Sequence, residues 1–187
     1  MSAPHQRLRR RARSGMTLIE VTIAMGVLTV AVFLFTGVIA SSSRIGSEKR
    51  QQSVAAHAAR SQLERLRGLP FEQVWALCNE RTDDDPAGAG TAPGPHFSVP
   101  GLDVRPDDSD GHVGRIGVPS VAGALREDAQ SIELGLPRDL DGDSLVDERD
   151  HASDYRILPV RVEVEWQSPL GPRRIEMFTM LAPEGSR

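Results

Sequence analysis

Acidic residues recur at alternate positions in one short segment of the C-terminal third of the chain. The segment, residues 139–150, reads DLDGDSLVDERD, so carboxylates fall at its first, third, fifth, ninth and twelfth positions. Alternate residues of EF-hand and dockerin-like loops turn inward around Ca²⁺, a hard cation that takes oxygen ligands, and the seventh residue contributes its backbone carbonyl. The spacing predicts a calcium site with the side chains of Asp139, Asp141, Asp143, Asp147 and Asp150 and the carbonyl of Leu145 as ligands.

Two residues of this loop depart from the calcium pattern. Ser144 stands where glycine is usual, and Asp150 replaces the bidentate glutamate, as dockerin-type loops allow. Pro137 lies just before the loop, so no helix is expected to enter it. The alternative interpretation is a solvated acidic turn that joins two strands. Mg²⁺ fits less well, because it keeps its waters and rarely uses an all-protein cage.

The side chains that enzymes use as nucleophiles or metal ligands are not spaced for catalysis. His96, His112 and His151 lie in irregular or acidic segments without metal-ligand spacing, and no serine occupies a nucleophile-elbow pattern. Cys78 is the single cysteine, so no disulfide forms within the chain. We interpret it as a half-buried apolar side chain, with an intermolecular thiol contact or a nucleophile as alternatives. The sequence predicts a protein that is not an enzyme.

Charge is distributed unevenly along the 187 residues. The first fifteen residues contain five arginines and no acid, which leaves 17 basic against 26 acidic residues in the rest, a net charge of about −9. Such an acidic body argues against nucleic acid as a partner. The length suits one globular domain with an appendage.

An apolar segment follows the arginines. Residues 16–40 read MTLIEVTIAMGVLTVAVFLFTGVIA and would span about 37 Å as a helix, enough to cross a bilayer. The arginines would stay cytoplasmic, which places the C-terminal body outside the cytoplasm. Glu20 interrupts the segment, and an ionised side chain there costs about 2.5–3.5 kcal/mol, so a functional partner is expected. The alternative is that Glu20 lies near the interface and stays hydrated.

The residues around Glu20 resemble those of a known family. The stretch GMTLIEV, residues 15–21, follows an arginine-rich leader and resembles the class III signal of type IV prepilins and type II secretion pseudopilins. The resemblance covers residues 9–40. It implies that prepilin peptidase removes residues 1–15 by cutting between Gly15 and Met16, and that Met16 becomes the N-methylated N-terminus. Met16 stands where phenylalanine is usual, a departure that the family tolerates.

The resemblance also implies how such a subunit assembles. Glu20 matches the family's glutamate and, inside a filament, would pair with the Met16 amine of a neighbour and set the axial register. The implied partners are prepilin peptidase, other major and minor pilins, and the inner membrane, which the subunit spans once before it joins a periplasmic or cell-surface pilus. Residues 55–70, AAHAARSQLERLRGLP, resemble minor pilins of the pilus-modification (PilV-like) group. The alternatives are a type II secretion pseudopilin and a membrane-anchored calcium-dependent adhesin.

The expected fold class is α+β. The resemblance implies a pilin-like arrangement in which a long N-terminal helix, membrane-spanning in its first half, packs on a C-terminal antiparallel sheet. Helical periodicity continues through residues 41–68, where Gly68 and Pro70 end it. Residues 79–130 are rich in Asp, Pro and Gly, with short strands expected near 96–99 and 113–118. The resemblance implies that residues 69–130 form the variable αβ-loop region of pilins.

The sheet is expected within residues 131–187. A strand over residues 131–136 precedes the acidic loop, and alternation from Tyr155 to Trp166 predicts a second strand. A turn at residues 168–172 returns the chain to a third strand over residues 175–181. Trp75 and Trp166 are interpreted as core residues.

Overall fold

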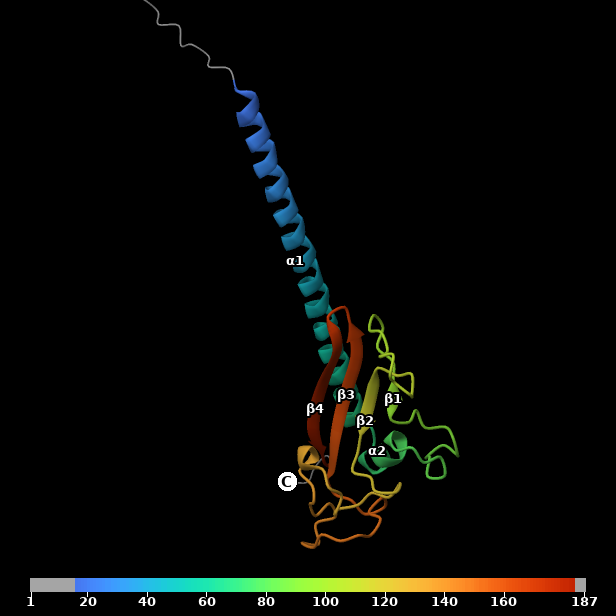
Figure 1. Cartoon of the computed structure of the whole chain (residues 1–187). Helices are drawn as coiled ribbons and strands as arrows, with labels where there is room; N and C mark the ends of the chain where they lie inside the picture. The colour runs from blue at the N-terminus through green and yellow to red at the C-terminus, as the bar shows by residue number, and fades with distance from the viewer. Residues whose placement is uncertain (1–15, 184–187) are drawn as a thin grey trace, which may run out of the picture. The chain divides into compact units, whose positions relative to one another are not determined.

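The computed structural model describes residues 16–183, apart from the side chain of Ala40 (Figure 1). The predicted leader, residues 1–15, lies outside the described residues, and so does Gly15. The chain divides into two compact units, residues 1–43 and residues 44–187, and we call the described part of the second unit the head. The elements are α1 (Leu18–Arg67), α2 (Phe71–Cys78), β1 (His96–Phe97), β2 (Gly114–Gly117), the 3₁₀ turn η1 (Ile132–Leu134), β3 (Leu158–Ser168) and β4 (Gly171–Leu181).

The first part of α1 is an apolar helix with an exposed surface. Its large apolar side chains are all exposed, from Val21 at 39% to Leu18 at 85%. The hydroxyls of Thr22, Thr29 and Thr36 donate to backbone carbonyls of the preceding turn, at 2.8–2.9 Å. Their polar groups are therefore satisfied within the helix. The helix is long and apolar enough to cross a membrane, as the sequence predicts.

The second part of α1 contributes one face to the core of the head. Ala55, Ala59, Leu63 and Leu66 are buried at helical spacing and belong to the same apolar cluster as the inward side chains of β3. The helix ends at Arg67, where the Gly68 amide donates to the carbonyl of Glu64, in agreement with the predicted end.

A short helix that the sequence analysis missed follows at once. Residues 69–78 were expected in an irregular segment, but Phe71–Cys78 form α2. Val74, Trp75 and Cys78 lie on one face of this helix and are buried. Trp75 is thus a core residue, as predicted, and Cys78 is fully rather than half buried, at 3% exposure.

The four strands form one antiparallel sheet in the order β1-β2-β3-β4. In β3 the valines at 160, 162 and 164 and Trp166 are completely buried, whereas the residues between them are partly exposed. This alternation confirms the predicted half-buried strand. The short strands expected near residues 96–99 and 113–118 correspond to β1 and β2. The architecture is therefore α+β, with a long N-terminal apolar helix and a C-terminal antiparallel sheet.

The prediction of a strand over residues 131–136 is wrong. The amides of Leu134 and Leu136 both donate to the carbonyl of Ser131, so this segment turns on itself as η1. Gly135, with φ of 71°, ends the turn in the left-handed region that favours glycine. Because those amides are used locally, they do not pair with the sheet, and Ile132 is left 94% exposed.

Candidate functional site

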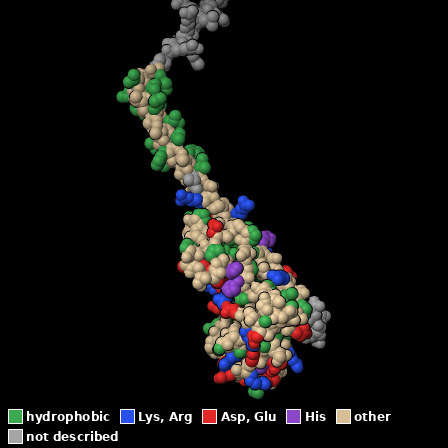
Figure 2. All heavy atoms as spheres, turned by 90° about the vertical axis from the view of Figure 1, so that its right-hand side faces the viewer, with side chains coloured by type: hydrophobic (Ala, Val, Ile, Leu, Met, Phe, Trp, Pro, Cys, Tyr) green, Lys and Arg blue, Asp and Glu red, His purple; other side chains and the backbone are tan. Residues whose placement is uncertain are grey.

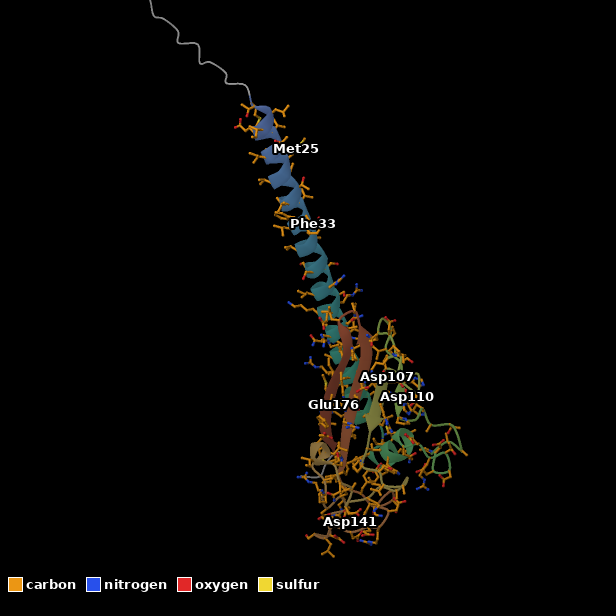
Figure 3. The ribbon with its side chains drawn as sticks, viewed as in Figure 1. Met25, Phe33, Asp107, Asp110, Asp141 and Glu176 are labelled. Carbon is orange, nitrogen blue, oxygen red and sulfur yellow. The ribbon has the colours of Figure 1, made fainter. Side chains whose placement is uncertain are left out.

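The acidic loop, which we define as residues 139–150, lies at the end of the head just before β3. Figure 3 places Asp141 among the irregular segments beyond the ends of β3 and β4. Leu140 anchors the loop, because its side chain is completely buried and its carbonyl accepts from the amides of Arg156 (2.7 Å) and Ile157 (3.1 Å). The loop is therefore attached directly to the entry of β3.

Within the loop, alternate aspartates accept hydrogen bonds from backbone amides further along the chain. Asp139 accepts from Gly142 (2.5 Å) and Ser144 (2.8 Å), and Asp141 accepts from Asp143 (3.0 Å). The same i to i+2 bond joins Asp143 to Leu145 (2.7 Å) and Asp147 to Arg149 (2.8 Å). Carboxylates that cap the backbone in this way create consecutive Asx turns. The alternate spacing thus shapes the loop itself.

One buried carboxylate from outside the loop binds two separate parts of it. Glu127, 1% exposed, accepts from the Leu140 amide at 2.5 Å and the Asp141 amide at 3.3 Å through Oε1, and from the Asp147 amide at 3.2 Å through Oε2. Hydrogen bonds to an ionised acceptor are about twice as strong as neutral ones. The sequence analysis missed Glu127, because no spacing rule connects it to the loop.

A buried histidine lies among the carboxylates. His151 Nε2 is 3.1 Å from Asp147 Oδ1, and His151 Nδ1 is 3.1 Å from Asp154 Oδ1. Glu127 and Asp141 carboxylate oxygens lie 3.7 and 3.6 Å from the same ring. Burial by itself lowers the pKa of His151, but the hydrogen bond to Asp147 and the charges of Glu127 and Asp154 outweigh it and hold the pKa above its ordinary value. The neighbouring carboxylates thus stabilise the imidazolium form relative to the same group in water.

Three groups of side chains in the described part of the chain bring ligand atoms within 4.8 Å of one another. They are Glu127, Asp139 and Asp141; Glu127, Asp147 and His151; and Asp141, His151 and Asp154. The first group offers only carboxylate oxygens, which suits a hard cation such as Ca²⁺. The other two contain an imidazole, which suits transition metals better.

The predicted calcium ligands therefore separate into two sets. Asp139, Asp141 and Asp147 belong to these groups, whereas Asp143 and Asp150 belong to none of those found among residues 16–183. Asp150 Oδ1 accepts from the amides of Leu125 (3.0 Å) and Ala152 (3.1 Å), and its Oδ2 lies 3.4 Å from Arg81. Leu145 enters the hydrogen bonding of the loop through its amide. Figure 2 shows acidic and basic side chains intermixed over this end of the head.

The predicted processing segment lies partly inside the described residues. Met16 and Thr17 precede α1, and Glu20 is exposed in its first turn. The Glu20 amide donates to Thr17 Oγ1 at 3.3 Å, so Thr17 caps the helix. The spacing Thr-x-x-Glu is that of a capping box, a local role for Glu20 that the sequence analysis did not consider.

Comparison of the chain with protein-family models, with characterised proteins and with solved structures gives no significant match.

Proposed function

We propose that the chain is a minor pilin, a structural subunit that prepilin peptidase processes and that primes or modifies assembly of a type IV pilus at its tip. The observation that carries the proposal is the stretch GMTLIEV at residues 15–21, which follows five arginines and opens α1. A class III signal needs this order of basic leader, glycine, cleavage point and glutamate-bearing apolar helix. The α+β layout of helix and antiparallel sheet suits a pilin-like subunit.

The exposed apolar surface of α1 supports the same proposal. The large apolar side chains of the helix before Ser43 are all exposed, and a surface of that extent is not stable in water. It needs lipid or neighbouring helices around it. A pilin uses both in turn, with the inner membrane as its first environment and other pilins of a filament as its second.

N-terminal mass spectrometry of the mature protein tests the processing step. We expect a chain that begins at N-methylated Met16 in cells that contain prepilin peptidase, and an uncut chain when Gly15 is replaced by leucine. An uncut wild-type chain, or one that is cut near Ser41, would contradict the proposal.

Glu20 is proposed to pair with the Met16 amine of a neighbouring subunit, and its place in the capping box makes two variants informative. Glu20→Gln keeps a side chain that functions at this position of a capping box but removes the charge. We expect both Glu20→Gln and Glu20→Ala to be processed and yet absent from sheared filaments, with Glu64→Ala on the exposed surface of the head as the control. Normal incorporation of Glu20→Gln would contradict the proposed pairing with the Met16 amine.

The second candidate is a type II secretion pseudopilin, whose signal is the same. Deletion of the gene separates the two, because a minor pilin is required for twitching motility and a pseudopilin for exoprotein secretion. A membrane-anchored calcium-dependent adhesin would affect neither and would show surface binding by the protein that requires Ca²⁺.

We also propose that Ca²⁺ is bound at the acidic loop. The supporting observation is the all-oxygen group of Glu127, Asp139 and Asp141, in which each residue offers an oxygen within 4.8 Å of the others. Bound Ca²⁺ would stabilise the head by mass action, by about 2.7 kcal/mol at a hundred times its dissociation constant.

Thermal melting of the full chain in a non-ionic detergent tests the calcium proposal. We expect Ca²⁺ to raise the melting temperature of the wild type more than Mg²⁺ does, and to have no effect on Asp141→Asn. Glu148→Gln is the matched control, since its exposed side chain lies in the same loop but in none of the three groups. A wild type that Ca²⁺ at about millimolar concentration does not stabilise would contradict the proposal.

A further inference from the structure

A pocket of about 320 Å³ opens on the head where the end of α2, β2 and β3 meet. Three of its lining residues are arginines from separate parts of the chain, namely Arg81 after α2, Arg115 in β2 and Arg161 in β3. Glu80 is the one acidic residue among those that line it. We call it the arginine pocket.

Arg161 is the arginine whose hydrogen-bonding capacity is least used. Its guanidinium makes no hydrogen bond to any residue in the range 16–183, and its Nε is buried without a partner. The nearest carboxylates, those of Glu163, Glu133 and Glu176, lie at 3.6, 3.7 and 3.8 Å, which is ion-pair contact but too long for a hydrogen bond. The Nη groups of Arg161 therefore have donor capacity that no described acceptor uses, and a ligand oxygen that reached them would add charge-assisted hydrogen bonds.

Gly117 gives the Arg161 guanidinium its position. The two residues face each other in the register of β2 and β3. A Cβ atom at position 117 would lie 3.2 Å from Nε and 3.5 Å from Nη2 of Arg161. The missing side chain therefore lets the guanidinium lie across β2, beside the pocket, where a larger residue at 117 would force it away.

The other two arginines differ in their availability. Arg115 pairs with Glu80 at 2.9 Å, but both side chains are more than half exposed, and such pairs contribute little to stability and exchange readily. Arg81 is held by Asp83 at 3.1 Å and lies near Asp84 and Asp150. Arg115 can therefore turn to a ligand, whereas Arg81 forms a fixed part of the wall.

We propose that the arginine pocket binds an oxyanion, the carboxylate or phosphate group of a ligand, with Arg161 and Arg115 as the charged donors. A planar guanidinium matches two oxygens of such a group with parallel hydrogen bonds, which neutral donors cannot equal in strength. The bound anion accepts from Arg161 and replaces Glu80 as the partner of Arg115. The two proposed donors, Arg161 and Arg115, contact no residue of the acidic loop in the described part of the chain, although Arg81 in the wall of the pocket lies 3.4 Å from Asp150.

Arginine footprinting on the unmodified full chain in a non-ionic detergent is the first test. Phenylglyoxal modifies accessible guanidinium groups, and peptide mass spectrometry then reports the extent at each arginine. We expect inorganic phosphate or acetate to protect Arg161 and Arg115 saturably at constant ionic strength, while sodium chloride does not. Arg138 is the internal reference, because its exposed side chain makes no hydrogen bond or ion pair with the described residues. Protection by phosphate alone or by acetate alone identifies the ligand group.

Variants make the test quantitative. Arg161→Gln should weaken the binding of the protecting anion about tenfold or more, as expected for the loss of a charge-assisted hydrogen bond, whereas Arg138→Gln should leave it unchanged. Arg161→Lys keeps the charge but lacks the planar guanidinium, so its affinity for the anion should lie between those of Arg161→Gln and Arg138→Gln. Equal protection of Arg138, or no protection by either anion beyond that of chloride, would overturn the proposal. The footprint of the wild type remains decisive even if a variant fails to fold.

Discussion

The carboxylate of Glu127 and the imidazole of His151 lie 3.7 Å apart between Oε2 and Nε2, and each side chain is only 1% exposed. Both residues lie outside the acidic loop in sequence, yet they form its interior. The loop is thus built around two buried ionisable side chains, and its own Asp141 and Asp147 lie 3.6 and 3.1 Å from the imidazole. Such a pair is costly to break from one side, because the remaining charge stays buried.

Replacement of Glu127 should therefore unfold the loop and destabilise the head. Glu127→Ala leaves three backbone amides without their acceptor and removes the carboxylate that lies 3.7 Å from His151, and we expect it to lower the free energy of unfolding by about 3–5 kcal/mol. Urea denaturation of the full chain in detergent measures this. Glu133→Ala, on the exposed turn η1, is the control and should change stability by less than about 0.5 kcal/mol. Equal effects of the two variants would contradict the role of Glu127.

Asp147 should make the head sensitive to acid. The Arg149 amide and then the Arg149 guanidinium, with a smaller effect of His151, lower the pKa of Asp147 to about 2 in spite of partial burial. Because the folded-state pKa lies below the unfolded value, this stabilisation is complete above about pH 4 and is lost as the pH falls through about 2. Asp147→Asn should thus lose less stability than the wild type over this range, whereas Glu148→Gln should behave as the wild type does.

The Tyr155 hydroxyl should ionise only at a pH well above its ordinary pKa, and its neutral form should stabilise the head. Its hydroxyl donates to the Phe71 carbonyl at 2.6 Å and accepts from the Trp75 amide at 3.4 Å, and its burial raises the pKa to about 12. Because Tyr155 is the single tyrosine, the absorbance of tyrosinate reports it alone, and we expect a midpoint near 12 in the folded protein.

The corresponding stability should decrease with rising pH. A folded-state pKa above the unfolded value of 10.0 means that the contribution of Tyr155 is complete below about pH 10 and is lost as the pH rises through about 12. Tyr155→Phe removes this dependence and should itself cost about 1–3 kcal/mol, since the Phe71 carbonyl loses its donor. A midpoint near 10 in the folded protein would show that the hydroxyl is solvated.

Cys78 should be inert in the folded protein. Its burial in the core raises the pKa of the thiol to about 11, although the charge of Arg65 opposes the shift. At about pH 8 only about one thiol in a thousand is then ionised, and the thiolate is the reactive form. We expect iodoacetamide to label Cys78 only after denaturation, as measured by intact mass. Labelling of the folded protein at the denatured rate would exclude the buried position.

Local patterns in the sequence predicted most of the regular structure. The two-residue alternation of β3 and the helical spacing of Ala55, Ala59, Leu63 and Leu66 each specify one buried face, and both elements formed as expected. The wrong or missed elements were short. The formation of elements as short as α2 and η1 depends on which neighbours cover them, and neighbours distant in sequence are not encoded in a local pattern.

The candidate site was predictable only in part, for the same reason. The alternation of Asp139, Asp141 and Asp143 marked the loop, but alternate aspartates also produce Asx turns, and the structure uses them in that way. Glu127 and His151 reach the loop through tertiary contacts. Asp150 could not be separated from the ligand set by its spacing, since its bond to the Leu125 amide joins distant residues.

The hydrogen bonds of the three threonines in the apolar part of α1 do not depend on what surrounds the helix. The hydroxyls of Thr22, Thr29 and Thr36 donate hydrogen bonds to backbone carbonyls of the same helix, so none of them requires an acceptor from another molecule. Exchange of a hydrocarbon solvent for the side chains of neighbouring helices would then break no hydrogen bond of these residues. For these residues, the transfer would replace one set of dispersion contacts with another.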